Sequence, residues 1–286
     1  MKKLSLFTLA FLSMWGLQSC TETTTKADNH STENTEKVDQ AEKPAAAAVT
    51  HWEKGGLKVY AMEDSPKFAD ASLELETPAA GLGLVAGANQ FKFNVSNYEL
   101  AAQTSDAEGK GLANSGKGQH IHFILNNGPY SAHYSNEFEK ELDDGHYVLL
   151  AFLSRSYHES VKAPAAAAIR QFVVGEPANF KEMNLSAPHM FYSRPKGAYY
   201  GADTKKLMLD FYLANVNLAP DGHKVRATIN GNEFVFTKWA PYLIEGLPMG
   251  TVKIKLELLG PDGNLVKSRF NPVEREVVLA EMKPES

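Results

Sequence analysis

Apolar and polar residues alternate strictly in several short segments beyond residue 50. In Phe91–Ser96 (FKFNVS) and Lys253–Leu258 (KIKLEL), every second side chain is apolar. This is the period of a β-strand with one buried face. Gly, Asn, Asp and Pro residues separate such segments at short intervals. Short alternating strands between turn residues predict an all-β fold of the sandwich type.

The pattern occurs twice along the chain. Phe91–Leu100 resembles Leu209–Leu218, and Ile121–Asn126 resembles Val225–Asn230. The second copy is shorter because it has no counterpart to most of the loop at 101–118. A pattern that recurs in the same order indicates a duplicated structural unit.

We therefore predict two tandem Ig-like or cupredoxin-like β-sandwich modules, the first at residues 51–175 and the second at residues 176–286. Ala163–Arg170 (APAAAAIR) is the one stretch whose composition favours a helix. The apolar residues 172–174 are expected to form the last strand of the first module.

The start of the chain predicts export. Lys2 and Lys3 precede an apolar stretch that is too short to cross a bilayer. Leu17-Gln18-Ser19-Cys20 then matches the bacterial lipobox, in which the cysteine thiolate is lipidated. We predict a lipoprotein signal peptide at residues 1–19 and a lipid anchor on Cys20, the only cysteine in the chain. The alternative is an ordinary signal peptide with an incidental cysteine.

Residues 20–50 are rich in Thr, Lys, Glu and Asn and poor in large apolar residues. Such a segment cannot bury enough surface to fold alone, so we predict a flexible tether between the membrane and the modules. Thr21, in place of Asp, favours the outer membrane over the inner membrane. The formal net charge of −5 and the absence of a basic stripe argue against nucleic acid as a partner.

Candidate chemistry is concentrated in the first module, where histidines recur. His120 and His122 are two residues apart in a strand pattern and therefore share one strand face. His133 and His158 follow in later segments of the same module. Imidazoles from one strand face and from neighbouring segments can bind Zn²⁺ or Cu²⁺. We predict a metal site formed by these four histidines.

Glu137, Glu159 and Tyr134 could add oxygen ligands or orient the histidines. The alternative is that the histidines are structural, either exposed or held by hydrogen bonds, because solvated strand faces often carry a His-x-His pattern. In the second module, Lys224 and Arg226 occupy the positions of His120 and His122. The strand therefore forms without histidine, and the first module's imidazoles need another explanation, either function or drift.

Gly118–Asn126, followed by His133 and Leu142–His158, resembles a family of bacterial exported domains of unknown function. In that family a glycine-led histidine cluster enters an apolar strand, and a Leu-rich strand ends near another histidine. This chain has Gln119 at one histidine position of the cluster. Residues 117–162 also resemble Bacteroidetes-type lipoproteins that carry the automatic name phosphopeptide-binding protein. The resemblance implies an exported module type rather than an activity.

These patterns predict a non-enzymatic cell-envelope lipoprotein whose first module binds a transition metal, with the second module as a scaffold or partner-binding unit. The alternative is an interaction module for peptides or phosphopeptides without a metal, in which Lys117, Arg155 and Lys162 could bind phosphate. The sequence contains no nucleophile elbow, phosphate-binding loop or His-Glu-x-x-His motif. An enzyme of another type stays open.

Overall fold

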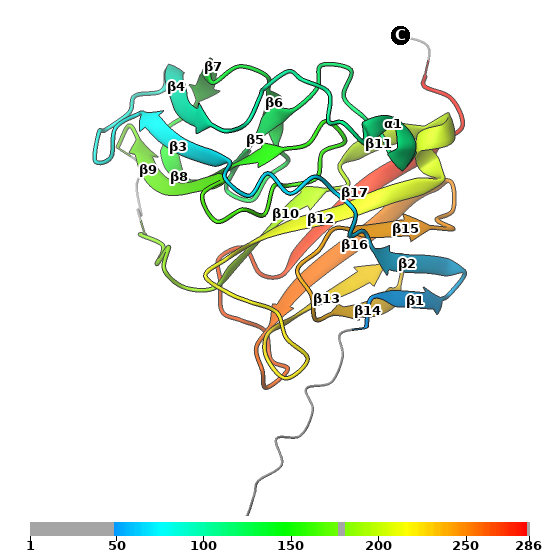
Figure 1. The fold of residues 1–286 in the computed structure, drawn as a ribbon. Helices are drawn as coiled ribbons and strands as arrows, with labels where there is room; N and C mark the ends of the chain where they lie inside the picture. The colour runs from blue at the N-terminus through cyan, green and yellow to red at the C-terminus, as the bar shows by residue number, and fades with distance from the viewer. Residues whose placement is uncertain (1–48, 177–180, 285–286) are drawn as a thin grey trace, which may run out of the picture. The chain divides into compact units, whose positions relative to one another are not determined.

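The computed structural model describes residues 49–176 and 181–284, and nearly all regular structure in them is β-strand (Figure 1). Helical turns are limited there to α1 (Ala107–Lys110) and a 3-10 turn, η1 (Gly201–Thr204). The predicted signal peptide, Cys20 and almost all of the tether lie outside the described residues. Within the described part, none of the helices has the length and apolar character needed to cross a membrane.

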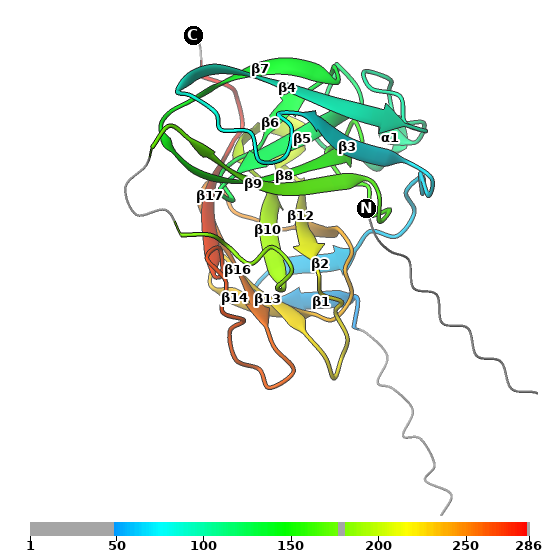
Figure 2. The same cartoon turned by 90° about the vertical axis from the view of Figure 1, so that its left-hand side faces the viewer.

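The first sandwich contains β3 (Ser72–Thr77), β4 (Gly87–Ser96), β5 (His120–Leu125), β6 (Ser131–His133), β7 (Glu137–Leu142), β8 (Gly145–Ser154) and β9 (Ala167–Val174). One sheet has the order β3-β4-β7 and the other the order β6-β5-β8-β9, as Figure 2 shows from the side. All neighbouring strands in these two sheets are antiparallel.

The core of the first sandwich follows the alternation seen in the sequence. Phe91 and Phe93 of β4 are fully buried together with Ile121 and Phe123 of β5. The rings of Phe91 and Phe123 meet edge to face, with centroids 4.8 Å apart. The odd-numbered residues of β5 therefore face the interior of this sandwich, and the even-numbered residues face away from it.

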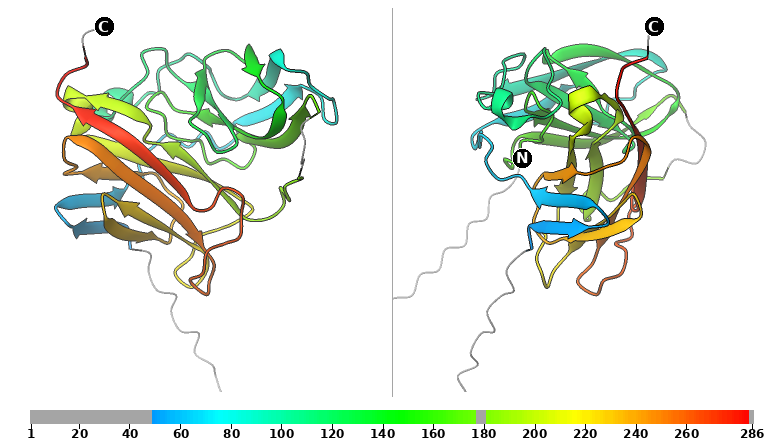
Figure 3. Two further views of the ribbon diagram at one scale, coloured as in Figure 1. Left: turned by 180° about the vertical axis from the view of Figure 1, so that it is seen from behind. Right: turned by 90° about the vertical axis from the view of Figure 1, so that its right-hand side faces the viewer.

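The second sandwich contains β10 (His189–Arg194), β11 (Gly197–Tyr200), β12 (Lys206–Ala214), β13 (Lys224–Ile229), β14 (Asn232–Phe236), β15 (Tyr242–Glu245), β16 (Gly250–Leu259) and β17 (Val273–Ala280), together with β1 (His51–Lys54) and β2 (Leu57–Ala61). Its sheets have the orders β1-β2-β15-β12-β10 and β11-β17-β16-β13-β14. The antiparallel pair β16 and β17 is seen from behind in Figure 3.

The two sandwiches repeat one strand order, in agreement with the duplication expected from the sequence. The sheet β3-β4-β7 corresponds to β10-β12-β15, and β6-β5-β8-β9 corresponds to β14-β13-β16-β17. Both first strands also shift register near their ends, between Leu75 and Thr77 in β3 and between Tyr192 and Arg194 in β10. Corresponding strands therefore pair in the same order in both sandwiches, which supports the all-β sandwich architecture.

The boundary between the modules differs from the one expected. Residues 51–61 were assigned to the first module, but β2 pairs with β15 of the second sandwich. Leu57 and Val59 of β2 are buried in the core of that second sandwich. Their apolar alternation fits either module, and only the pairing partner decides which sheet they join.

The helix expected at Ala163–Arg170 does not form. Ala163 to Ala166 make a turn, closed by a 3.0 Å hydrogen bond from the Ala166 amide to the Ala163 carbonyl, and β9 begins at Ala167. Pairing along β8 places the half-buried Ile169 opposite Leu150 and overrides the helix preference of alanine. The strand expected at residues 172–174 is present as the end of β9.

The outer face of the sheet β6-β5-β8-β9 is covered by the second sandwich. Ile124, Leu150 and Phe152 on this face pack in one apolar cluster with Phe191 and Tyr212 of the second sandwich. The rings of Phe152 and Tyr212 stack with centroids 5.3 Å apart. The even-numbered face of β5 is thus an interior surface rather than a solvated one.

A buried carboxylate also joins the two sandwiches. Asp210 of β12 is fully buried and accepts hydrogen bonds from the amide and the hydroxyl of Ser160, each at 3.1 Å. The Lys162 ammonium group lies 2.9 Å from the same carboxylate. These contacts fix the segment after β8 to the second sandwich.

Replacing Asp210 with Ala is expected to reduce the free energy of unfolding by about 3–5 kcal/mol, because it leaves the Ser160 amide and the Lys162 charge without their acceptor. Chemical denaturation checks this. The matched control is Glu276→Ala, which removes an exposed ion pair with Lys253 and should change stability by less than about 0.5 kcal/mol. Equal effects of the two substitutions would show that the Asp210 contacts contribute no more to the free energy of unfolding than an exposed ion pair does.

Candidate metal centre

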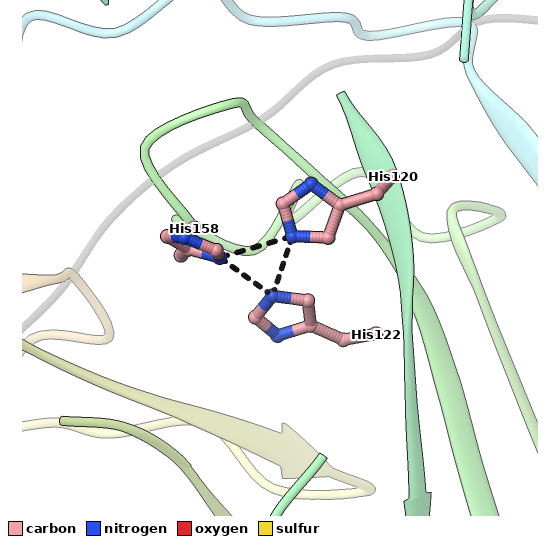
Figure 4. A group of neighbouring side chains, drawn as sticks. All are labelled: His120, His122 and His158. Atoms are coloured by element: carbon pink, nitrogen blue, oxygen red, sulfur yellow. Dashed lines mark hydrogen bonds between the residues drawn. The ribbon is translucent and has the colours of Figure 1, made fainter. Parts of the chain in front are cut away.

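Three ring nitrogens converge on one point at the start of β5 (Figure 4). Nε2 of His120 lies 3.0 Å from Nδ1 of His158 and 3.0 Å from Nε2 of His122. The third edge of the triangle, from Nε2 of His122 to Nδ1 of His158, is 3.4 Å. Such an arrangement of imidazoles could hold a metal ion.

Strand alternation places two of these rings. His120 and His122 project from the even-numbered face of β5, as the sequence predicted, and both are fully buried. Their burial follows from the position of that face between the sandwiches. This strand face is therefore not solvated, which removes the exposed form of the structural alternative but not its hydrogen-bonded form.

The third ring comes from the tight loop that follows β8. The Arg155 amide donates to the Glu159 carbonyl at 2.9 Å, and the His158 amide donates to the Arg155 carbonyl at 2.8 Å. His158 itself has φ of 71°, in the left-handed region that non-glycine residues seldom adopt. A strained residue that carries a converging side chain is a common feature of functional sites.

Hydrogen bonds at the far side of the rings set their tautomers. Nδ1 of His120 lies 2.8 Å from the Gly118 carbonyl oxygen, which can only accept, so this nitrogen carries the proton. Nε2 of His120 then presents its lone pair to the centre of the triangle. Nδ1 of His122 lies 3.2 Å from the Ser193 hydroxyl of β10, which can hold that ring in the same tautomer.

Burial keeps the three rings neutral. Desolvation lowers the pKa of His120 to about 4, although the Gly118 carbonyl opposes the shift. Desolvation also holds the pKa of His122 and the pKa of His158 well below the usual value, and nearby positive charges reinforce both shifts. Metal ions bind the neutral form of imidazole, so at neutral pH the protons do not compete for these nitrogens.

The triangle has the dimensions of a metal-ligand face. For metal–nitrogen bonds of about 2.0–2.1 Å, neighbouring ligands are about 2.9 Å apart at right angles and about 3.3 Å apart in a tetrahedron. The three observed edges of 3.0, 3.0 and 3.4 Å cover this range. A single proton can bridge only one edge, whereas a cation at the centre satisfies all three lone pairs.

Oxygen atoms surround the triangle. The Tyr130 hydroxyl lies 3.1 Å from Nδ1 of His158, and its ring stacks on His122 with centroids 3.6 Å apart. The Ser154 hydroxyl lies 3.2 Å from Nε2 of His122. Both hydroxyls lie within hydrogen-bond distance of a ring nitrogen of the triangle.

His133 does not belong to this centre, although it was predicted as a ligand. It pairs with Ile121 in the β5–β6 register, and directly opposed residues share a face. Its ring therefore lies on the core side of the sheet, stacked on Phe138 at 3.4 Å. Its Nε2 lies 2.8 Å from the Ser131 hydroxyl. The register of β6, which the sequence did not give, decides the direction of this side chain.

Other candidates from the sequence have other partners. Glu159 forms an ion pair with Arg155 at 3.3 Å, and the Tyr134 hydroxyl lies 2.7 Å from the Ser115 hydroxyl. Glu137 is bound by the side chain of Gln90. Arg155, one of the cations considered for phosphate, is buried and donates to the Ser160 carbonyl at 3.0 Å. These groups contribute to folding contacts within the described residues.

Tyr130, Ser193 and Arg194 were missed by sequence reasoning. Tyr130 follows a turn in the first sandwich, whereas Ser193 and Arg194 belong to β10 of the second. No spacing in the sequence relates β10 to the histidines, because their contact depends on how the sandwiches pack. Tyr130 could have been considered from the sequence, because it directly follows the turn at Asn126–Pro129, which comes after the histidine strand.

Neither a protein-family model nor a curated protein matches this chain. Among solved structures, the fibronectin(III)-like modules of CbhA from Clostridium thermocellum are similar, with 12% identity and a TM-score of 0.26 over 73% of this chain and 94% of that one. The central fibronectin-III array of RIM-binding protein has 11% identity and a TM-score of 0.23, covering 75% of this chain and 70% of that one.

A third similar structure is the SGBP-B protein of a Bacteroides ovatus mixed-linkage glucan utilization locus, in complex with a mixed-linkage heptasaccharide. It has 15% identity and a TM-score of 0.23, over 72% of this chain and 46% of that one. Similarities this low assign no function. The site must be judged from its own geometry.

Metal-free protein is expected to lose stability as the pH falls from about 6.5 toward 4. The unfolded chain binds protons on its histidines in this range, whereas the buried rings of His120, His122 and His158 do not. Each ring should therefore contribute a slope of about 1.4 kcal/mol per pH unit. Denaturation with urea at several pH values measures the slope. His122→Gln should make it shallower, and an identical slope would contradict the neutral state assigned to this ring.

Proposed function

We propose that this protein is a metal-binding lipoprotein of the cell envelope, in which the first sandwich holds a Zn²⁺ or Cu²⁺ ion. The single observation that carries the proposal is the convergence of three neutral imidazole nitrogens from β5 and the loop after β8. Both metals accept imidazole, and the edges of the triangle suit a tetrahedral or a right-angled arrangement. The role proposed is binding, because the three ring nitrogens are arranged as ligands around one point.

The exposure of the three histidines also supports the proposed metal site, because it leaves a route by which an ion can enter. His120 and His122 are fully enclosed, whereas His158 is partly exposed on its loop. A ligand on a loop next to two ligands on a rigid strand allows an ion to enter and then be enclosed. The strand provides preorganisation, which reduces the entropy lost on binding.

Purified full-length protein is expected to bind Zn²⁺ or Cu²⁺ with sub-micromolar affinity, measured by isothermal titration calorimetry and equilibrium dialysis. At a free metal concentration of 100 times the dissociation constant, the native state should gain about 2.7 kcal/mol of stability. His120→Ala and His158→Ala should each weaken binding by more than about 100-fold, since each removes a direct ligand.

The matched control is His133→Ala, which removes an imidazole from the opposite face of the same sheet. It should retain the affinity of the unsubstituted protein. Absence of sub-micromolar binding of both metals, together with an unchanged melting temperature, would refute the metal site. Equal losses in His133→Ala and His120→Ala would mean that binding reflects histidine content rather than this geometry.

The lipid anchor is proposed on the lipobox that ends at Cys20. Cys20→Ala should move the protein from the membrane fraction to the soluble fraction of the bacterial envelope, because a multiply acylated cysteine is the only membrane attachment proposed. Labelling with a radioactive or clickable fatty acid gives the direct measurement. His122→Ala should still be labelled, and labelling of Cys20→Ala would place the lipid elsewhere.

A further inference from the structure

A cavity of about 820 Å³ lies where the two sandwiches meet, and it shares no residue with the histidine centre. Its walls come from His146 of β8, from the segment 181–189 that leads into β10, and from the turn 265–271 between β16 and β17. A cavity of this volume is large enough to hold a small organic molecule.

Hydrogen bonds hold the walls of this cavity in place. The amide and the carbonyl of Met183 both bond to the side chain of Gln171 in β9, each at 2.9 Å. The ring of His189 lies 2.8 Å from the Asn184 carbonyl oxygen and 2.9 Å from the Ser268 hydroxyl, so it ties the segment before β10 to the turn after β16. A preformed cavity loses little entropy when a ligand binds.

Part of the cavity wall is apolar. Met183, Ala187, Leu265 and Val266 all contribute to it. Leu265 is 44% exposed, although it lies beside other apolar side chains. A hydrocarbon bound in the cavity would remove this surface from water, which is favourable.

The same cavity carries an excess of positive charge, in a chain whose formal net charge is −5. Lys181, Lys267 and Arg269 line it, whereas Glu182 is the one carboxylate among its lining residues. None of these three cations forms an ion pair with a carboxylate within residues 49–176 and 181–284. The cavity therefore favours a ligand that brings a negative charge.

Arg269 is the cation whose position is fixed by a further contact. Its Nη1 donates to Nδ1 of His146 at 3.1 Å, so one end of the guanidinium is held against the first sandwich. A guanidinium has five N–H donors and can bind two oxygens of a carboxylate or a phosphate at once. One contact to an imidazole leaves donors of Arg269 for such a group.

We propose that this cavity binds an amphiphile with one hydrocarbon chain and one anionic headgroup. The chain would pack against Met183, Leu265 and Val266, and the headgroup would bind Arg269. The apolar wall distinguishes this ligand from a small inorganic anion, and the unpaired cations distinguish it from a neutral hydrocarbon. The proposal is independent of the metal site.

Calorimetric titration of full-length protein with decanoate, below its critical micelle concentration, tests the proposal. The dissociation constant is expected below about 100 µM. Hexanoate should bind at least about tenfold more weakly, because four CH₂ groups are lost. Decanol, which has the same chain without the charge, should bind at least about fivefold more weakly. Decyl phosphate in parallel identifies the headgroup, since the tighter of the two anionic ligands marks a carboxylate or a phosphate site.

Substitutions locate the binding in this cavity. Arg269→Gln and Leu265→Ser should each weaken decanoate binding by at least about fivefold. The matched controls are Lys253→Gln and Leu82→Ser, which change an exposed cation and an exposed leucine outside the cavity and should leave the affinity unchanged. Three results would each overturn the proposal: no binding of either decanoate or decyl phosphate at about 1 mM, decanol binding as tight as decanoate, or equal losses in the cavity variants and the controls.

Discussion

The centre depends on one packing contact, the coverage of the even-numbered face of β5 and β8 by the second sandwich. Without that cover, His120 and His122 would stand in water and titrate as ordinary surface histidines. With it, they lose solvent, stay neutral and turn their lone pairs toward one another. The same contact brings Ser193 to the His122 ring and Arg194 to the Tyr130 hydroxyl. The face that carries these two histidines is thus enclosed by the packing of the two sandwiches against each other.

Two cationic side chains lie close to the histidine centre. Arg194 and Lys196 approach from β10 and the residues after it, and on their own they oppose a bound cation. The corresponding strand of the second sandwich carries Lys224 and Arg226 at the positions of His120 and His122.

Much of the architecture was predictable from the sequence, because strand alternation and the repeat are local patterns. The shared face of His120 and His122 followed from the two-residue period of a strand. The burial of that face did not, since it depends on a contact between segments far apart in the chain. The direction of His133 depended on the register of β6, and the helix expected at Ala163–Arg170 gave way to pairing with β8. Arg194 had no signal in the sequence beyond its place before a proline.

The position of β1 and β2 determines how the two halves can be separated. The chain contributes these strands to the second sandwich, crosses to build the first, and then returns to complete the second. A fragment that ended after residue 175 would contain β1 and β2 without the rest of the second sandwich. A fragment that began there would lack these two strands, and the edge of β15 would be exposed. Neither half is therefore a free-standing unit in gene fusion or recombination. The first sandwich behaves topologically as an insertion within the second.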